Sequence, residues 1–171
     1  IVRTNPESGF RLLLTKYKKP IYWHIRRIVV GHDDAQDAAQ ETFVRVFRNF
    51  SSCKSGDKLR GWIFRIATNE ALRMLDKRKS TTLSLDDEAT NIAGQTIADP
   101  YFDNSDKAAV MLQKAILSLP TKQQLTFNLR YYDEMTYDDI AEVIGSTASA
   151  AKMNYHIAKD KIVKFINSND L

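Results

Sequence analysis

Residues 138–162, "DDIAEVIGSTASAAKMNYHIAKDKI", contain two segments of helical periodicity separated by a short polar break. The break contains Gly145, the residue type that most readily ends a helix in the left-handed conformation. Two helices joined by such a turn form a helix-turn-helix. The same pattern also fits a helical hairpin with no nucleic-acid role. The apolar residues that recur at the helical spacing are Ile140, Ile144, Ala151, Tyr155, Ala158 and Ile162.

The second of these helices would place its N-terminal part in the major groove of DNA. It contains no arginine, the commonest reader of guanine. Asn154 can instead pair bidentately with adenine, while Lys152 can reach guanine and, with Lys159, can hold phosphates. We therefore expect a preference for adenine-containing sites, with DNA shape contributing to recognition. The side chains expected to face outward are Ser149, Lys152, Met153, Asn154, His156 and Lys159.

The remainder of the chain is also expected to be helical, because no segment alternates apolar and polar residues as a strand does. Apolar residues recur at the helical period in residues 10–30, 33–50 and 59–79. Pro20 is expected to divide the first segment into two helices or to kink one helix. Gly31 is expected to end it. The predicted fold class is all-α, with two small helical bundles.

Charge divides the chain into three parts. Residues 1–79 contain 17 basic and 8 acidic residues, which suggests a domain that binds a polyanion. Residues 80–106 contain six acidic residues and no basic ones, without helical periodicity, which predicts an acidic linker. Residues 107–171 contain eight basic and seven acidic residues and include the helix-turn-helix. These three ranges are the expected domain organisation.

Several classes of protein are disfavoured by the composition. No run of 18 apolar residues could form a membrane-spanning helix, and the first residues lack the apolar core of a signal peptide. The single cysteine, Cys53, excludes an internal disulfide and a cysteine-rich zinc site. The three histidines are dispersed, and no glycine-rich phosphate loop or nucleophile elbow is present. We expect no metal, no cofactor and no catalysis.

Three motifs occur in order along the chain. Residues 37–43 contain D-x-x-Q-E-x-F, residues 62–69 contain W-x-x-R-I-A-x-N, and residues 136–145 contain T-Y-x-D-I-A-x-x-x-G. With these motifs the chain resembles an extracytoplasmic-function (ECF) sigma factor, the small bacterial type with two of the conserved sigma domains. The resemblance covers about residues 10–165 except the linker. It implies a dissociable subunit that binds core RNA polymerase and opens promoter DNA in the cytoplasm.

The resemblance assigns roles to residues of the first domain. It implies polymerase-binding residues on one helix, which contact the clamp helices of the largest polymerase subunit: Asp37, Gln40, Glu41 and Phe43, flanked by Arg45 and Phe47. It further implies that the loop 51–58 and the helix around Asn69 hold a flipped base of the minus-ten element, at the cost of unstacking it. The residues implied in binding minus-ten DNA are Trp62, Arg65, Asn69, Arg73, Lys77, Arg78 and Lys79.

For the second domain, the resemblance implies recognition of the minus-thirty-five duplex and contact with the polymerase flap. The implied minus-thirty-five residues are Arg130, Thr136, Thr147, Ser149, Lys152, Met153, Asn154, His156 and Lys159. An anti-sigma factor, which in this family is often held at the inner membrane, is a further implied partner. The chain departs from the family pattern at Arg73, where aspartate is frequent, and at Asn154 and Ile157, which replace arginines. A helical interaction protein that is not a sigma factor remains the alternative.

Overall fold

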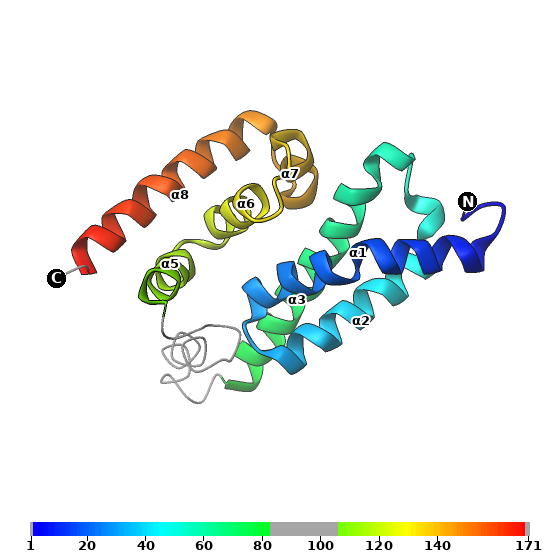
Figure 1. Ribbon diagram of the computed structural model, residues 1–171, viewed down its shortest axis with the longest axis horizontal. Coiled ribbons are helices and arrows are strands. Elements are labelled where there is room, and N and C mark those ends of the chain that lie inside the picture. Colours follow the sequence, from blue (N-terminus) through cyan, green and yellow to red (C-terminus); the bar gives the residue numbers. More distant parts are fainter. Residues whose placement is uncertain (1, 83–105, 170–171) are drawn as a thin grey trace. The chain divides into compact units, whose positions relative to one another are not determined.

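The computed structural model describes the backbone of residues 2–82 and 106–169, and the side chains of residues 2–77 and 106–169. Every regular element in these ranges is helical, which confirms the all-α prediction (Figure 1). The chain forms two compact units, residues 1–77 and 78–171. Residues 83–105, most of the predicted linker, lie outside the described residues, while its first residues, 80–82, complete a helix.

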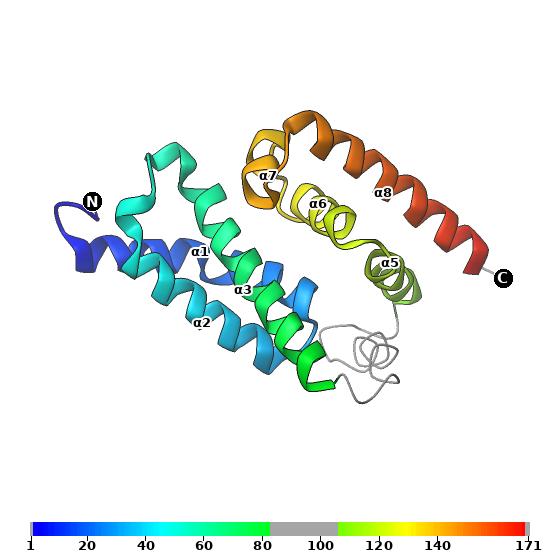
Figure 2. The same ribbon diagram turned by 180° about the vertical axis from the view of Figure 1, so that it is seen from behind.

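The first unit contains three long helices and two short 3-10 turns. These are α1 (Pro6–Val29), α2 (His32–Arg48), η1 (Phe50–Ser52), η2 (Gly56–Lys58) and α3 (Leu59–Thr82). Figures 1 and 2 show α3 lying across α1 and α2. Side-chain contacts tie the crossing together, since His24 of α1 lies 2.8 Å from Thr68 of α3. The core between them includes Ile21, Ile25, Ala35, Val46, Ile63, Phe64 and Ala67.

Helix α1 continues through Pro20, so the expected division into two helices does not occur. Proline removes one backbone donor, which costs stability inside a helix. The buried side chains of Tyr17, Ile21 and Ile25 follow one another at four-residue spacing across the proline. Their packing holds both halves of the helix on the same apolar face, and this outweighs the lost hydrogen bond.

The prediction that Gly31 ends the first helix in the left-handed conformation is wrong. The residue with positive φ is Val30, with φ 72° and ψ −47°, whereas Gly31 has φ −73° and precedes α2. A β-branched residue is strained in this region. Two contacts stabilise the turn: the Arg26 Nε donates to the Val30 carbonyl at 2.6 Å, and the Gly31 N–H donates to the Val29 carbonyl at 2.8 Å. Burial of the Val30 side chain further favours this conformation.

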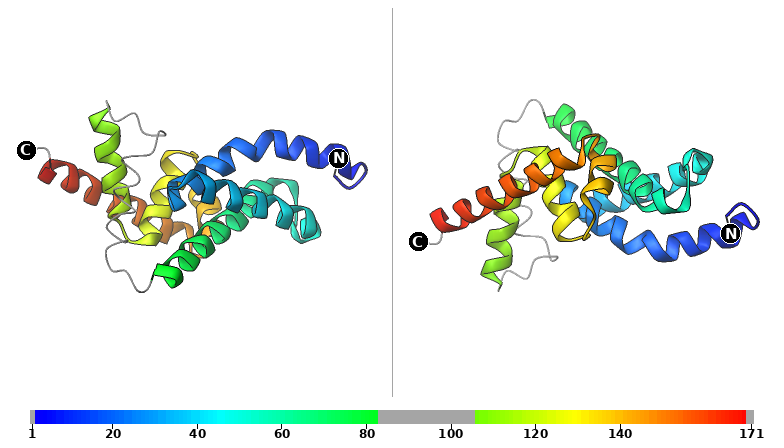
Figure 3. Two further views of the ribbon diagram at one scale, coloured as in Figure 1. Left: turned by 90° about the horizontal axis from the view of Figure 1, so that it is seen from below. Right: turned by 90° about the horizontal axis from the view of Figure 1, so that it is seen from above.

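The second unit contains α5 (Lys107–Leu117), α6 (Thr121–Tyr131), α7 (Tyr137–Ile144) and α8 (Ala148–Asn169). Helix α8 packs against α5, α6 and α7, and the views in Figure 3 show it crossing α5. Phe127 of α6 stacks on Tyr155 of α8, with ring centroids 5.7 Å apart. The apolar cluster that joins α5, α6 and α8 contains Ala115, Ile116, Leu119, Phe127, Ala158 and Ile162.

Helices α7 and α8 form the predicted helix-turn-helix. Thr136 caps α7, accepting a hydrogen bond from the Asp139 N–H at 3.2 Å, and Thr147 caps α8, accepting from the Ala150 N–H at 3.1 Å. Gly145 ends α7 in the left-handed conformation, with φ 68° and ψ 47°. The turn is therefore specified by three local residues.

Replacing Gly145 with alanine should lower the free energy of unfolding of the second unit by about 1 kcal/mol, because a Cβ disfavours positive φ. A Cβ at this position would meet no atom within 4 Å, so the penalty comes from the backbone alone. Urea denaturation followed by circular dichroism measures the change. Gly56→Ala is the matched control, since its Cβ also meets nothing and its φ is outside the positive region. Equal losses for the two variants would contradict the prediction.

Candidate nucleic-acid interface

A pocket of about 240 Å³ lies where the end of α2, the turn η1 and the first half of α3 meet. We call it the α2–α3 pocket. It combines an aromatic ring, two amides, a carboxylate and two guanidinium groups, which are all groups that bind nucleotides. Its lining residues are Arg45, Asn49, Ser52, Trp62, Ile66, Asn69, Glu70 and Arg73.

The apolar part of the pocket comes from one face of α3. Trp62 and Ile66 are four residues apart, so their side chains lie on the same face of the helix, and both are half-buried. Phe50 of η1 meets the Trp62 ring edge-on, with centroids 6.1 Å apart. The ring is thus fixed in orientation while part of it stays accessible. An accessible, fixed aromatic ring can stack on an unpaired base.

Asn69 lies beside this apolar surface and is exposed. Within the described part of the chain its side-chain amide makes no hydrogen bond or ion pair. An amide presents both donors and an acceptor. Asn69 therefore has its full hydrogen-bonding capacity available to a ligand in the pocket.

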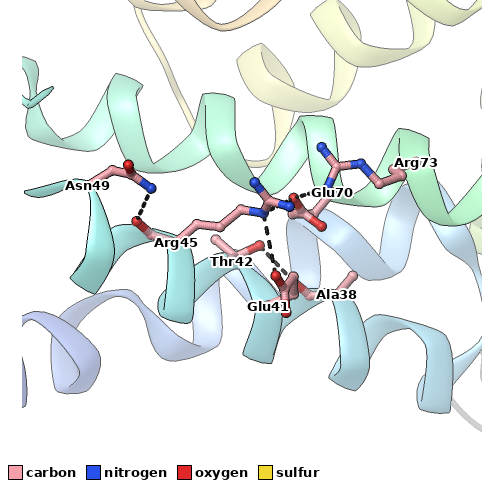
Figure 4. A network of polar contacts seen from close by, with 7 residues as sticks. All are labelled: Ala38, Glu41, Thr42, Arg45, Asn49, Glu70 and Arg73. Atoms are coloured by element: carbon pink, nitrogen blue, oxygen red, sulfur yellow. Dashed lines mark hydrogen bonds and ion pairs between the residues drawn. The ribbon is translucent and has the colours of Figure 1, made fainter.

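Glu70 is the centre of a charged network at the pocket (Figure 4). Its side chain is only 7 % exposed, and its Oε1 lies 2.5 Å from Arg45 Nε and 2.9 Å from Arg73 Nη1. Arg45 also lies 3.5 Å from Glu41 Oε1, one turn earlier on α2. The network joins α2 to α3 and fixes two guanidinium groups at the pocket. A carboxylate held between two cations is compensated, so the pocket keeps a net positive lining.

The network was not predicted from the sequence. Arg45 was expected to flank the polymerase contact, but its guanidinium group bonds to Glu70 of α3. The three-residue spacing of Glu70 and Arg73 is a signal for their pairing. No local signal links Arg45 to Glu70, because they are 25 positions apart and meet only through helix packing.

The outer face of α2 is the predicted polymerase contact. Asp37, Gln40 and Glu41 are exposed there, and Phe47 is 38 % exposed. Phe43 is 6 % exposed and lies in the core, and its role as a contact residue stays a prediction. Since the same helix must pack on α1, one of its two phenylalanines is buried to hold it there. The exposed carboxylates beside an apolar ring are suited to a protein partner with basic residues.

Basic residues of α3 lie along the helix outside the pocket. Arg65 and Lys77 are both exposed, and basic side chains of this kind contact phosphates. The side chains of Arg78 and Lys79 lie outside the described residues. The adjoining loop is held by Cys53, which is buried, and by the Ser55 hydroxyl, which donates to Asp57 and lowers the pKa of that carboxyl.

The outward face of α8 contains exposed side chains of three kinds. Ser149, Lys152, His156 and Lys159 are polar and exposed, and Asn154 is half-buried. Met153, a large apolar side chain, is 65 % exposed on the same face. A helix surface with cations, an amide and an apolar group can contact phosphates, adenine and the thymine methyl group.

The other predicted minus-thirty-five residues have internal partners. Thr136 and Thr147 cap their helices, as described above. Arg130 donates to the Met135 carbonyl at 2.9 Å, and its guanidinium carbon lies 4.6 Å from the Tyr137 ring centre. These contacts support the turn before α7. A direct role of these three residues in DNA binding stays a prediction.

No helix within residues 2–82 or 106–169 is long and apolar enough to cross a membrane. In the same ranges no group of three histidine, cysteine, aspartate or glutamate side chains could hold a metal ion.

The fold defines the class of two-unit, helical proteins with a helix-turn-helix in the second unit. The family described as Sigma-70 region 2 matches residues 13–81, and Sigma-70 region 4 matches residues 109–162. The two matches together cover most of the chain, one in each unit. The chain belongs to the ECF sigma factors of bacterial RNA polymerase.

Similar proteins match over nearly the whole chain. The ECF RNA polymerase sigma factor SigW of Bacillus subtilis is 28 % identical over 95 % of this chain and 91 % of its own length. The ECF RNA polymerase sigma-E factor of Haemophilus influenzae is 23 % identical over 94 % and 89 %.

Two solved structures share the fold. The structure of the sigma factor RpoE in complex with the anti-sigma factor NepR from Bartonella quintana has a TM-score of 0.76 at 20 % identity, covering 94 % of this chain and 98 % of that chain. The structure of CnrH in complex with the cytosolic domain of CnrY has a TM-score of 0.71 at 17 % identity, with 97 % and 92 % covered.

Proposed function

We propose that this chain is a dissociable, non-catalytic subunit that binds core RNA polymerase and directs it to specific promoters. The observation that carries the proposal is the match of one sigma region to each unit. Each matched region also contains an exposed surface suited to DNA: the α2–α3 pocket in the first unit and the outward face of α8 in the second. Because a polymerase subunit acts on the chromosome, its place of action is the bacterial cytoplasm.

The first unit is proposed to open the minus-ten element. A base that leaves the stack would enter the α2–α3 pocket, stack against Trp62 and bond to the Asn69 amide. Arg65, Arg73 and Lys77, with Arg78 and Lys79, would hold the neighbouring phosphates. The Asn69 side-chain amide supports this role, because it makes no hydrogen bond or ion pair within the described residues and can therefore bond to a base.

The second unit is proposed to bind the minus-thirty-five duplex through α8. The absence of arginine from this helix favours adenine and thymine over guanine as contacted bases. The exposed Met153 supports this preference, since an apolar group can contact the thymine methyl group. An anti-sigma factor and the polymerase flap are proposed as further partners.

Transcription with purified components tests the function. Core polymerase supplemented with this chain should initiate at promoters enriched from a random library, and core polymerase alone should not. An absence of core binding and of redirected initiation would refute the proposal.

Charge reversal on α2 tests the polymerase contact. Asp37→Lys should weaken binding to core polymerase at least about tenfold, because a carboxylate facing basic residues is replaced by a like charge. Fluorescence anisotropy of the labelled chain against core polymerase measures the dissociation constant. Glu7→Lys is the matched control: it makes the same charge reversal at the start of α1, where an exposed ion pair with Arg11 is lost. Similar losses in both variants would contradict a specific contact at α2.

A further inference from the structure

A second pocket of the first unit lies between the first half of α1 and the loop that contains η1 and η2. We call it the α1–loop pocket. Its volume of about 620 Å³ lies within the range of roughly 300–1,000 Å³ that is typical of sites for small molecules. Among the described residues none lines both this pocket and the α2–α3 pocket, so the two are separate sites.

The walls of the α1–loop pocket are mostly apolar. Helix α1 contributes Leu12, Leu13 and Tyr17, and the residues after α2 contribute Phe50 and Leu59. Leu13 and Tyr17 are buried, whereas Leu12 is 58 % exposed. A ligand with an apolar part would remove the Leu12 side chain from water, which is favourable in proportion to the area covered.

The N-terminal residues belong to the wall because Gly9 has no side chain. A Cβ at Gly9 would lie 2.5 Å from the Cα of Val2, which is closer than two non-bonded carbon atoms can approach. The contact between Val2 and Gly9 holds the N-terminal turn against α1. Val2 and Arg3 of this turn both line the pocket.

The charged residues that line the pocket are all basic: Arg3, Lys16 and Lys54. They come from the N-terminal turn, from α1 and from the loop, and all three are exposed. Within residues 2–77 and 106–169 none of the three forms an ion pair. Charges of one sign beside apolar walls raise the local concentration of ions of the opposite sign.

The carboxylates closest in sequence do not line this pocket and have partners of their own. Glu7 pairs with Arg11 at 3.4 Å, and Asp57 accepts a hydrogen bond from the Ser55 hydroxyl. The described lining therefore contains positive charge without a compensating acidic group. This arrangement favours an anionic ligand.

Uncharged polar groups are few in the α1–loop pocket. The Cys53 thiol donates to the Ser55 carbonyl at 3.4 Å, and Ser55 in turn donates to Asp57. Sugars and bases need several placed hydrogen-bonding groups for recognition. The lining is better suited to a molecule with an apolar tail and one anionic head.

We propose that the α1–loop pocket binds a fatty acid. The alkyl chain packs against Leu12, Leu13 and Phe50, and the carboxylate forms charge-assisted hydrogen bonds with Lys16 and Lys54. This binding site goes beyond the proposed function, since it requires neither polymerase nor DNA.

Isothermal titration calorimetry of the full chain with dodecanoate, below the concentration at which micelles form, tests the proposal. We expect saturable binding of about one dodecanoate per chain. Dodecan-1-ol has the same tail without the charge and should bind at least about tenfold more weakly. An absence of saturable binding, or equal affinities for the acid and the alcohol, would overturn the inference.

Charge reversal locates the carboxylate. Lys16→Glu should weaken dodecanoate binding at least about tenfold, because it places a like charge beside the ligand head. Lys18→Glu is the matched control, since Lys18 is also exposed on α1 but does not line the pocket. Its effect should stay below about threefold, because exposed charges are screened by salt. Similar losses in both variants would contradict a carboxylate site at Lys16.

A second pair of variants locates the alkyl chain. Leu12→Asp should weaken binding at least about tenfold by placing a charge against the apolar tail. Val163→Asp makes the same change at a side chain of α8 that is 56 % exposed, and it should leave the affinity unchanged. An unchanged affinity in Leu12→Asp would refute binding in this pocket.

Unfolding of the first unit distinguishes a bound ligand from a detergent effect. Tryptophan fluorescence reports on this unit, which contains both tryptophans. A ligand that binds the folded state raises the urea midpoint, so dodecanoate should raise it in the wild-type chain and not in Leu12→Asp. A lower midpoint in the presence of dodecanoate would indicate binding to the unfolded chain and would overturn the inference. Because these assays contain no polymerase, their failure would leave the proposed function untouched.

Discussion

The free energy of unfolding of the first unit should fall by about 2 kcal/mol between pH 7 and pH 5 because of His24 alone. His24 is completely buried, and burial, together with the nearby Arg27 charge, lowers its pKa from 6.5 to about 3. The Thr68 hydroxyl donates to the Phe64 carbonyl at 2.7 Å, so it accepts from His24 Nε2, and the histidine is neutral.

The direction of the pH effect follows from these two pKa values. In the unfolded chain His24 takes up a proton below about pH 6.5, whereas in the folded unit it remains neutral until about pH 3. The unfolded state therefore binds more protons throughout this window. The stability that neutral His24 provides is complete above pH 6.5 and is lost progressively as the pH falls, to a total of about 5 kcal/mol near pH 3.

Tryptophan fluorescence isolates the first unit in this experiment, because both tryptophans, Trp23 and Trp62, lie in it. Urea denaturation of the wild-type chain and of His24→Leu should give a difference in unfolding free energy that changes by about 2 kcal/mol between pH 7 and pH 5. His156→Leu, a change at an exposed histidine of the second unit, is the control and should leave this signal unaffected. A pH-independent difference for His24→Leu would refute the prediction.

Asn69→Ala should reduce promoter opening by roughly 10- to 100-fold and leave binding to core polymerase unchanged, because it removes a contact with one extracted base. Asn69 is exposed and makes no hydrogen bond or ion pair within the described residues, so its removal should cost the fold little. We therefore expect the loss of the Asn69 amide to affect only the step in which a base enters the α2–α3 pocket. Formation of permanganate-reactive, heparin-resistant complexes on a selected promoter measures opening.

A template with a pre-formed bubble at the minus-ten element distinguishes opening from overall promoter affinity. If Asn69 stabilises the extracted base during melting, the bubble should restore most of the activity of Asn69→Ala, since unpairing no longer has to be driven. Asn167→Ala makes the same change at an exposed position near the end of α8 and serves as the control. Equal loss of core binding and promoter opening in Asn69→Ala would refute base capture.

Local patterns predicted most of the helices and the helix-turn-helix. The helix-turn-helix depends on interactions between residues a few positions apart, so it can be recognised in the sequence. These residues are the periodic apolar side chains of α7 and α8, the cap residues Thr136 and Thr147 and the turn residue Gly145. The resemblance to ECF sigma factors also came from short, ordered motifs. The candidate pocket was predicted in part, through Trp62, Asn69 and Arg73.

Features that depend on neighbouring helices could not be predicted from local patterns. Phe43 and Phe47 lie four residues apart on α2, and only the position of α1 and α3 decides that Phe43 is buried while Phe47 is partly exposed. The same holds for the α1–α2 turn, where contacts of Arg26 and burial of Val30 place the positive φ one residue before the glycine.

The sequence by itself thus determined which segments are helical, where the helix-turn-helix lies and to which family the chain belongs, because these depend on residues close together in the chain. The tertiary structure alone decided that Arg45 of α2 meets Glu70 of α3 and that the His24 side chain is fully buried. Both arrangements require α3 to cross α1 and α2, and such packing brings together residues separated by 25 or more positions.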